Sequence, residues 1–353
     1  MSVGARACAP GADGHPVGSA KAAVPIDGTV HGTMAPPAAP REPSTDRGDR
    51  NHRGHGTARS GRVLGWAALL AFIACAAVHT ASSIAGGGFD PRVALLWSSI
   101  AAALALIRLL PPRVPEAAMA ERIRARMSDR SPGAEAALLV GCLAAFAAAD
   151  AVLSPVFALI GPGAPPLSYY AAKAIFLLLI PPLFAGGSGI TRRSSGPDLL
   201  PLAARVHEPW RWAAPVPAAA FLALLALPWI AAPEPPGTLP SDYALGAVVA
   251  LTFAGVAVAD VLFFSVLLQT RLELLFGRWP GIAATAVVYG LSSLVGEPLT
   301  GGAHDLASAV AVQGASGLAA GYLWARYRNL WANLLLAGGV AALAMAPPTA
   351  AFL

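Results

Sequence analysis

Long apolar runs separated by short polar segments fill the chain from residue 63 onward. A bilayer core about 30 Å thick needs roughly 20 apolar residues in one helix, and runs of that length recur along the sequence. The pattern predicts an all-α polytopic membrane protein with about nine transmembrane helices. The seventh is the shortest and is open to being half-buried or re-entrant. The predicted spans are residues 63–85, 92–111, 135–160, 168–187, 212–232, 242–269, 280–296, 304–325 and 329–348.

The first 62 residues have a different composition. They are rich in Gly, Pro, Ala, Arg and His, and they contain no apolar run long enough to bury a face. They also lack the pattern of a secretory signal at their start, so the first apolar helix is expected to remain. The predicted organisation is a disordered cytoplasmic tail over residues 1–62, five transmembrane helices over 63–241, and a helical core over 242–353.

Composition supports a membrane protein and excludes two other classes. Of the 353 residues, 56% are hydrophobic and 12% charged, and the mean hydropathy is +0.60. The net charge of +5 comes from arginines scattered between apolar runs, with no basic stripe interleaved with aromatics, so no nucleic-acid partner is expected. Cys8, Cys75 and Cys142 form no CxxC pair, which excludes a disulfide framework and a zinc knuckle.

The distribution of arginine predicts the orientation in the membrane. Basic residues accumulate in short cytoplasmic loops, and here arginine-rich and arginine-poor loops alternate across all nine spans. This places the N-terminus in the cytoplasm and the C-terminus outside, in the cytoplasmic membrane. The arginines on the predicted cytoplasmic side are Arg47, Arg50, Arg53, Arg59, Arg62, Arg113, Arg122, Arg124, Arg126, Arg130, Arg192, Arg193, Arg205, Arg211, Arg271, Arg278, Arg326 and Arg328.

Three ionisable residues lie away from the span ends: Asp150, Lys173 and Asp260. Charges at membrane depth are costly, so each is a candidate functional residue. With the predicted orientation, Asp150 and Lys173 both fall in the outer half of adjacent helices. We therefore expect a structural Asp150–Lys173 ion pair, with a site for a polar substrate or a proton as the alternative.

The histidines do not form a metal motif. His79 and His304 lie near the outer ends of distant spans, and no HExxH, HxxxH or ExxH is present. Metal sites on helices need ligands at that spacing or on facing helices at one depth. The two histidines are therefore interpreted as interfacial residues, and no metal site is predicted.

The last third of the chain, about residues 245 to 345, resembles the CAAX-protease and bacteriocin-processing (CPBP, Abi) family of intramembrane proteases. ADVLFFSVLLQTRLELLFGRWPG stands where that family has a helix with EExxxR, and YGLSS stands where it has FxxxH. SGLAAGYLWARYRNLWANLLLAGG matches the family's Gly-rich helix, its basic turn and its entry into a final helix that bears HxxxN. The resemblance implies a helical core that binds a metal or activates water for peptide hydrolysis.

The catalytic positions of that family have changed in this chain. The paired glutamates fall on Ala259 and Asp260, the arginine on Phe264 and the first histidine on Ser293; the second histidine falls on Ala337 and the asparagine on Ala341. Metal-assisted hydrolysis needs about three protein ligands and a general base. One carboxylate without a histidine does not supply them, so family-type proteolysis is not expected.

Three functions follow as hypotheses. The first is a non-catalytic binding or regulatory membrane protein without a cofactor, in which Asp260 is the remnant of the paired-acid motif. Its expected partners are membrane lipids and a membrane protein or peptide. The second is an active endopeptidase that uses Asp260, with zinc as cofactor. The third is a small-molecule transporter with Asp150, Lys173 and Asp260 along its path, although the sequence shows no inverted repeat.

Overall fold

The computed structural model describes residues 50–85, 91–112, 116–126, 131–160, 165–184, 213–227, 253–297 and 302–345, which all belong to the unit Gly48–Leu353. Every regular element in these ranges is a helix. The first seven are α1 (Arg50–Ala85), α2 (Pro91–Leu109), α3 (Glu116–Arg126), α4 (Pro132–Ala158), α5 (Pro165–Lys173), α6 (Ile180–Phe184) and α7 (Pro215–Leu225). The others are α10 (Thr270–Phe276), α11 (Arg278–Ser292), α12 (Ala303–Ala309), α13 (Ala315–Tyr327) and α14 (Leu330–Met345), with the π-helical segments η1 (Ala174–Leu179), η2 (Val261–Gln269) and η3 (Val310–Gly314).

Part of each of the nine predicted spans is helical among the described residues. Four helices are long and apolar enough to cross a bilayer: Val63–Ala85, Pro132–Ala158, Phe253–Phe276 and Ala303–Tyr327. Shorter apolar helices cover four further spans, and α11, of 15 residues, corresponds to the seventh. The described part of the chain is therefore all helical, and its four long apolar helices make it a multi-pass membrane protein.

Two boundaries differ from the prediction, and others cannot be compared. Helix α1 already begins at Arg50, inside the segment predicted as a tail, because extending an existing helix costs far less than nucleating one. The sixth helix continues to Phe276, beyond the predicted end. Residues 1–49 of the predicted tail, the start of the sixth span and residues 346–353 lie outside the described residues.

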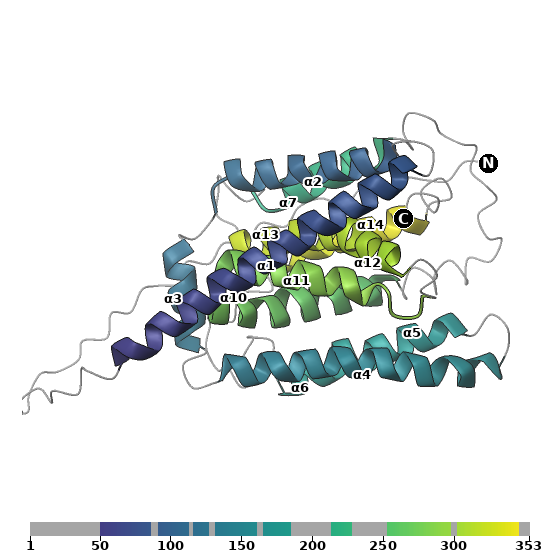
Figure 1. Ribbon diagram of the computed structural model, residues 1–353, viewed down its shortest axis with the longest axis horizontal. Helices are drawn as coiled ribbons and strands as arrows, with labels where there is room; N and C mark the ends of the chain where they lie inside the picture. Colours follow the sequence, from purple (N-terminus) through teal and green to yellow (C-terminus); the bar gives the residue numbers. More distant parts are fainter. Residues whose placement is uncertain are drawn as a thin grey trace, which may run out of the picture. The chain divides into compact units, whose positions relative to one another are not determined.

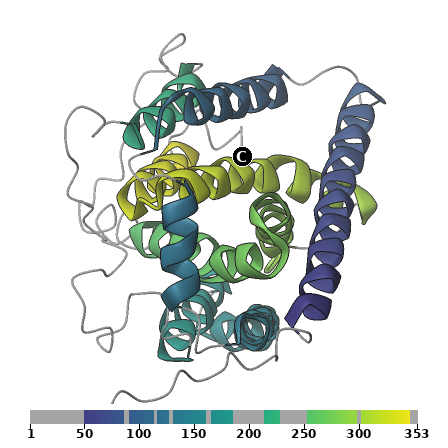
Figure 2. The ribbon, with the colours of Figure 1, turned by 90° about the vertical axis from the view of Figure 1, so that its left-hand side faces the viewer.

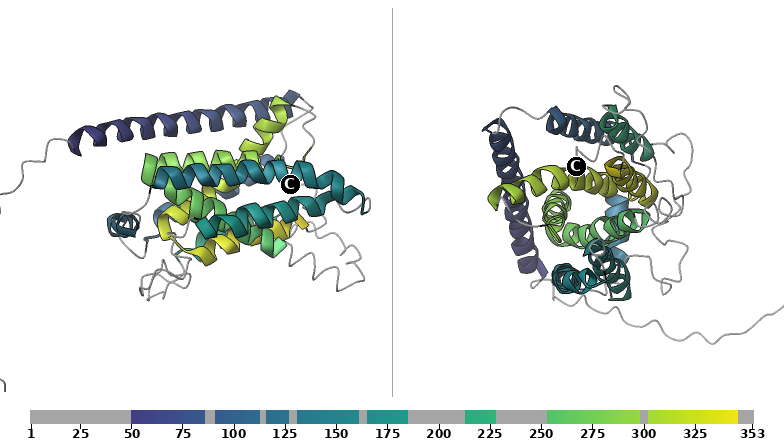
Figure 3. Two further views of the ribbon diagram at one scale, coloured as in Figure 1. Left: turned by 90° about the horizontal axis from the view of Figure 1, so that it is seen from below. Right: turned by 90° about the vertical axis from the view of Figure 1, so that its right-hand side faces the viewer.

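The helices of the C-terminal third lie between two groups of N-terminal helices (Figures 1 and 2). Helices α4 and α5 pack against each other on one side, and α2 and α7 pack against each other on the opposite side. Helix α1 contacts α10, α11, α12 and η3, and it runs along the outside of these helices in Figure 3. The short α3 crosses the ends of the other helices, as a connector would.

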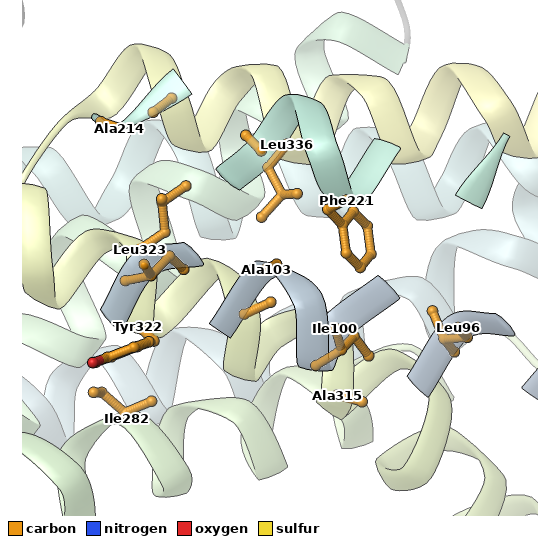
Figure 4. Close-up of a cluster of buried hydrophobic side chains, with 14 of the residues drawn as sticks. Leu96, Ile100, Ala103, Ala214, Phe221, Ile282, Ala315, Tyr322, Leu323 and Leu336 are labelled. Carbon is orange, nitrogen blue, oxygen red and sulfur yellow. The ribbon is translucent and has the colours of Figure 1, made fainter. Parts of the chain in front are cut away.

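One large apolar cluster joins α2 and α7 to the C-terminal helices (Figure 4). Ile100 on α2 and Phe221 on α7 are 2% and 1% exposed, and they meet Leu323 on α13 and Leu336 on α14. A second cluster, which includes Leu139, Phe146, Leu177 and Phe263, joins α4 and η1 to η2. The two clusters hold both N-terminal groups against the same central helices.

Helix α11 and segment η3 cross at two glycines. A Cβ on Gly290 would stand 2.8 Å from the backbone oxygen of Ala309 and 3.0 Å from the nitrogen of Gly314. A Cβ on Gly314 would stand 3.0 Å from the backbone oxygen of Ala286. Backbones approach this closely only where neither residue has a side chain, which is a common device in membrane helix packing.

We expect Gly290→Ala to lower the free energy of unfolding in detergent by about 1–3 kcal/mol, because the added methyl group meets backbone atoms that cannot move aside alone. Gly338→Ala is the matched control, since a Cβ there meets nothing within 4 Å. That control should be neutral or slightly stabilising. Thermal or chemical unfolding of the two purified variants measures the difference, and equal stability would contradict the close crossing.

Candidate functional site

A cavity of about 290 Å³ lies among the C-terminal helices and is closed on one side by α5. Its wall is mostly apolar, with Phe221, Leu336 and Val340 among the lining residues. Its volume is near the lower limit of ligand sites in proteins. Two side chains of opposite charge also line it: Lys173, which is buried, and Asp260, which is partly buried.

Lys173 and Asp260 form an ion pair in this cavity. The Lys173 Nζ atom lies 2.9 Å from Oδ1 of Asp260 and 3.0 Å from Oδ2, and their side chains are 7% and 14% exposed. Nζ also donates to the hydroxyl of Tyr169 at 3.2 Å, one helical turn earlier on α5. The ammonium thus uses its donors within the protein, and the pair carries no net charge.

Both charged residues precede a π-helical segment. Lys173 is the last residue of α5 before η1, and Asp260 immediately precedes η2. A π-helical turn changes the direction in which the following side chains project, and such turns are frequent at functional sites. The two segments contact each other, so the local helix geometry brings the charges to one point.

The predicted ion pair between Asp150 and Lys173 is not formed. Asp150 instead accepts a hydrogen bond from the Ser168 hydroxyl at 2.7 Å. Ser168 precedes Lys173 by five residues, or about 7.5 Å along a helix, so Asp150 lies too far along α5 to reach the ammonium. Sequence analysis placed the two residues on adjacent helices correctly, but it did not find that the lysine stem extends toward η2.

Asp150 belongs to a second pocket, of about 430 Å³. Several polar residues line it, including Ser154, Ser168, Tyr170 and Glu297. Tyr169 and Ser293 line both this pocket and the cavity with the ion pair. The three predicted site residues are thus divided between two adjacent hollows, with Lys173 and Asp260 in one and Asp150 in the other.

The family's motif positions converge on the ion-pair cavity. Phe264, Ser293, Ala337 and Ala341 all line it together with Asp260. Ala259, at the first acidic position, is 2% exposed and is not among the lining residues. The layout inferred from the sequence therefore corresponds to one place in the structure, although only Asp260 keeps a metal-ligating side chain there.

The residues present do not fit a catalytic metal ion. Among the described residues that line the cavity, Asp260 is the only acidic one, and none is a histidine or a cysteine. The Lys173 ammonium lies within 3.0 Å of both of its carboxylate oxygens, where a bound cation would lie. In the part of the chain that the structure describes, no three His, Cys, Asp or Glu residues are grouped to hold a metal, whereas zinc sites need three or four ligands.

A polar network lies at the other end of the segment Phe253–Phe276. Glu273 contacts Arg328 and Gln269, and the Arg328 guanidinium also donates to the Thr270 hydroxyl at 3.0 Å. Arg271, which is fully buried, pairs with Glu135 of α4 at 2.9 Å. These contacts hold in place the helix ends beside Gln269, which lines the cavity.

Sequence analysis missed the aromatic and amide residues of the site and one histidine contact. Tyr169 and Tyr289 line the cavity, and the Tyr289 ring meets that of Phe264 edge-on with centroids 5.1 Å apart. The i, i+4 spacing of Tyr169 and Lys173 was the one available signal. His79 and His304, on distant helices, stack with centroids 5.8 Å apart, which no local pattern indicates.

Comparison with known proteins identifies the family of the central helices. Residues 240–342 match the model of the family described as type II CAAX prenyl endopeptidase Rce1-like. The comparisons with curated proteins and with solved structures gave no match. The chain thus carries a CPBP, Rce1-like domain in its C-terminal third, as the motif layout predicted. Lys173 lies outside the matched residues, so the ion pair joins the family domain to a helix that precedes it.

We expect Lys173→Met to destabilise the protein by about 3–5 kcal/mol, because it leaves the buried Asp260 carboxylate without a partner. The double variant Lys173→Met, Asp260→Leu should recover most of that loss. Unfolding of the single and double variants in detergent gives the coupling energy. In the matched cycle, Lys173→Met and Asp150→Asn should be additive; strong coupling there, with none to Asp260, would contradict the observed pairing.

Proposed function

We propose that the chain is a non-catalytic binding or regulatory membrane protein whose CPBP-type cavity holds a ligand without cleaving it. The observation that carries this proposal is the ion pair between Lys173 and Asp260. It occupies the position of the family's acidic motif with a carboxylate that is already neutralised by a resident cation.

The chemistry of hydrolysis is missing from the cavity lining. A general base must be able to accept a proton from water, and both Asp260 oxygens lie within 3.0 Å of the Lys173 ammonium. The other family positions are occupied by Phe264, Ser293, Ala337 and Ala341. None of these residue types is a usual zinc ligand, unlike histidine. What remains is a partly open, largely apolar site suited to binding.

The membrane context of the proposal follows from the arginine distribution. We place the chain in the cytoplasmic membrane with its N-terminus inside, so that Asp150 and Asp260 lie toward the outer side and Arg328 toward the cytoplasm. Membrane lipids surround the helices, and a membrane protein or peptide is the proposed regulatory partner. No nucleic-acid partner is proposed.

The purified full chain in lipid nanodiscs should contain far less than one zinc per molecule and should not cleave a prenylated CAAX peptide. Both results follow from the absence of histidine ligands around Asp260. Elemental analysis and mass spectrometry of the peptide measure them, with an active CPBP protease as positive control. Stoichiometric zinc and cleavage, both lost in Asp260→Ala, would establish the active endopeptidase instead.

A second candidate function, small-molecule transport, is favoured by one observation. The polar pocket around Asp150 and the cavity around Asp260 share Tyr169 and Ser293 as lining residues. A polar solute that entered the first pocket would need to pass only these two side chains to reach the ion pair. A transporter requires such a path to be open to water, whereas a site filled from the bilayer does not.

Cysteine accessibility separates the two candidates. The test introduces single cysteines into a chain whose native cysteines are replaced. Ser154 lines only the pocket around Asp150, Ser293 lines both that pocket and the cavity with the ion pair, and Ser316 lines only the cavity. Under the binding proposal, a membrane-impermeant thiosulfonate added outside should modify Ser154→Cys and leave Ser316→Cys unmodified. Rapid modification of all three from the outer side would favour transport. Modification of Ser154→Cys from the cytoplasmic side alone would contradict the proposed orientation.

A further inference from the structure

Gln269 is a fully buried amide at the end of the cavity remote from the ion pair. Its Nε2 atom donates to Oε1 of Glu273 at 2.6 Å and to the backbone oxygen of Gly321 at 2.7 Å. Both partners are acceptors only, so they must face the amide nitrogen. The hydrogen bonds therefore determine the orientation of the amide group: its nitrogen faces the two acceptors, and its oxygen lies beside the α-carbon of Gly321, 3.0 Å from where a Cβ would stand.

The Oε1 atom of Gln269 has no hydrogen-bond donor within the structure that is described. The neighbouring hydroxyl of Thr285, which also lines the cavity, donates instead to the backbone oxygen of Gly281 at 2.8 Å. A buried acceptor without a donor loses its hydration without compensation. Because Gln269 lines the cavity, a molecule inside the cavity is the natural source of the missing donor.

The opposite end of the cavity sets the charge of that molecule. Lys173 and Asp260 neutralise each other, and the hydroxyl of Tyr169 accepts a further hydrogen bond from the ammonium. A charged ligand would therefore enter a low-dielectric site that has no free counter-ion. The cavity selects an uncharged molecule.

The apolar lining of the cavity indicates which kind of ligand skeleton fits between the ion pair and Gln269. Asp260 and Gln269 stand at the two ends of the π-helical segment η2, nine residues apart. Phe221, Leu336 and Val340 line the cavity with aromatic and aliphatic carbon. An aliphatic chain matches these walls, because burying it adds apolar contact without leaving a polar group unpaired.

We propose that the cavity binds an uncharged aliphatic molecule that donates an O–H or N–H group to Oε1 of Gln269, as a long-chain alcohol or primary amide does. This inference rests on the proposed binding function and specifies the class of ligand. Such a molecule dissolves in the bilayer, so the surrounding lipid phase supplies it.

The test uses a matched pair of photoreactive probes with the full chain in nanodiscs. One probe is decanol that carries a diazirine on its chain, and the other is the corresponding methyl ether, which has no donor. Peptide mapping by mass spectrometry locates the labelled residues. We expect saturable labelling of the cavity lining by the alcohol at about tenfold lower concentration than by the ether, the ratio that one buried hydrogen bond gives. Decanoate and decylamine should compete poorly.

Three variants serve as controls. Gln269→Met keeps the length of the side chain and removes the acceptor, so the alcohol and the ether should label it equally. Should that variant fail to fold, Gly321→Ala tests the same acceptor, because the added Cβ would stand 3.0 Å from Oε1 of Gln269 and displace the amide. The preference for the alcohol should then fall. Ala341→Phe fills the cavity and should abolish labelling by both probes.

The outcomes separate this inference from the proposed function. Equal labelling of the unaltered protein by the alcohol and the ether, or a preference for decanoate, would overturn the ligand class while leaving a binding cavity. Labelling that Ala341→Phe does not reduce would show that the cavity holds no ligand, and the proposed function would fail with the inference.

Discussion

The ion pair between Lys173 and Asp260 is the interaction on which the character of this cavity depends. It links α5 to the segment Phe253–Phe276 through two atom pairs within 3.0 Å. Neither charge is tolerated alone here, because an unpaired ion in a low-dielectric interior loses its hydration and gains no attraction in return. The lysine comes from outside the Rce1-like residues 240–342, so the family domain completes its site with a helix that precedes it.

The lone carboxylate is explained by this partner. Within the family pattern Asp260 stands at the second acid, and the structure brings the positions of the arginine, the histidines and the asparagine to the same cavity. Those positions hold Phe264, Ser293, Ala337 and Ala341, which makes the lining predominantly apolar. Among its described lining residues the cavity has one carboxylate and no histidine. A neutral ion pair at one end and the amide of Gln269 at the other define its polarity, and this combination supports the binding role proposed above.

Particular residues show how far the sequence could predict the site. The motif positions that share a cavity with Asp260 could be named from the resemblance to the family, whose motifs stand at fixed spacings along its helices. The partner of Lys173 could not be named in this way, because the sequence does not show how the helix that carries the lysine packs against η2, and that packing places Asp260 rather than Asp150 beside the ammonium. Gln269 carried no signal of its own, since an amide near the end of an apolar run resembles an interfacial residue until the surrounding helices bury it.

The sequence by itself determined the helical class, the positions of the four long apolar helices and the family of residues 240–342. These depend on apolar length and short motifs, both of which are local along the chain. The tertiary structure alone decided which charges pair, that Asp150 belongs to a separate pocket, and that His79 meets His304. Those facts depend on how helices rotate and cross, as at Gly290 and Gly314, and such contacts between distant residues have no counterpart in local sequence.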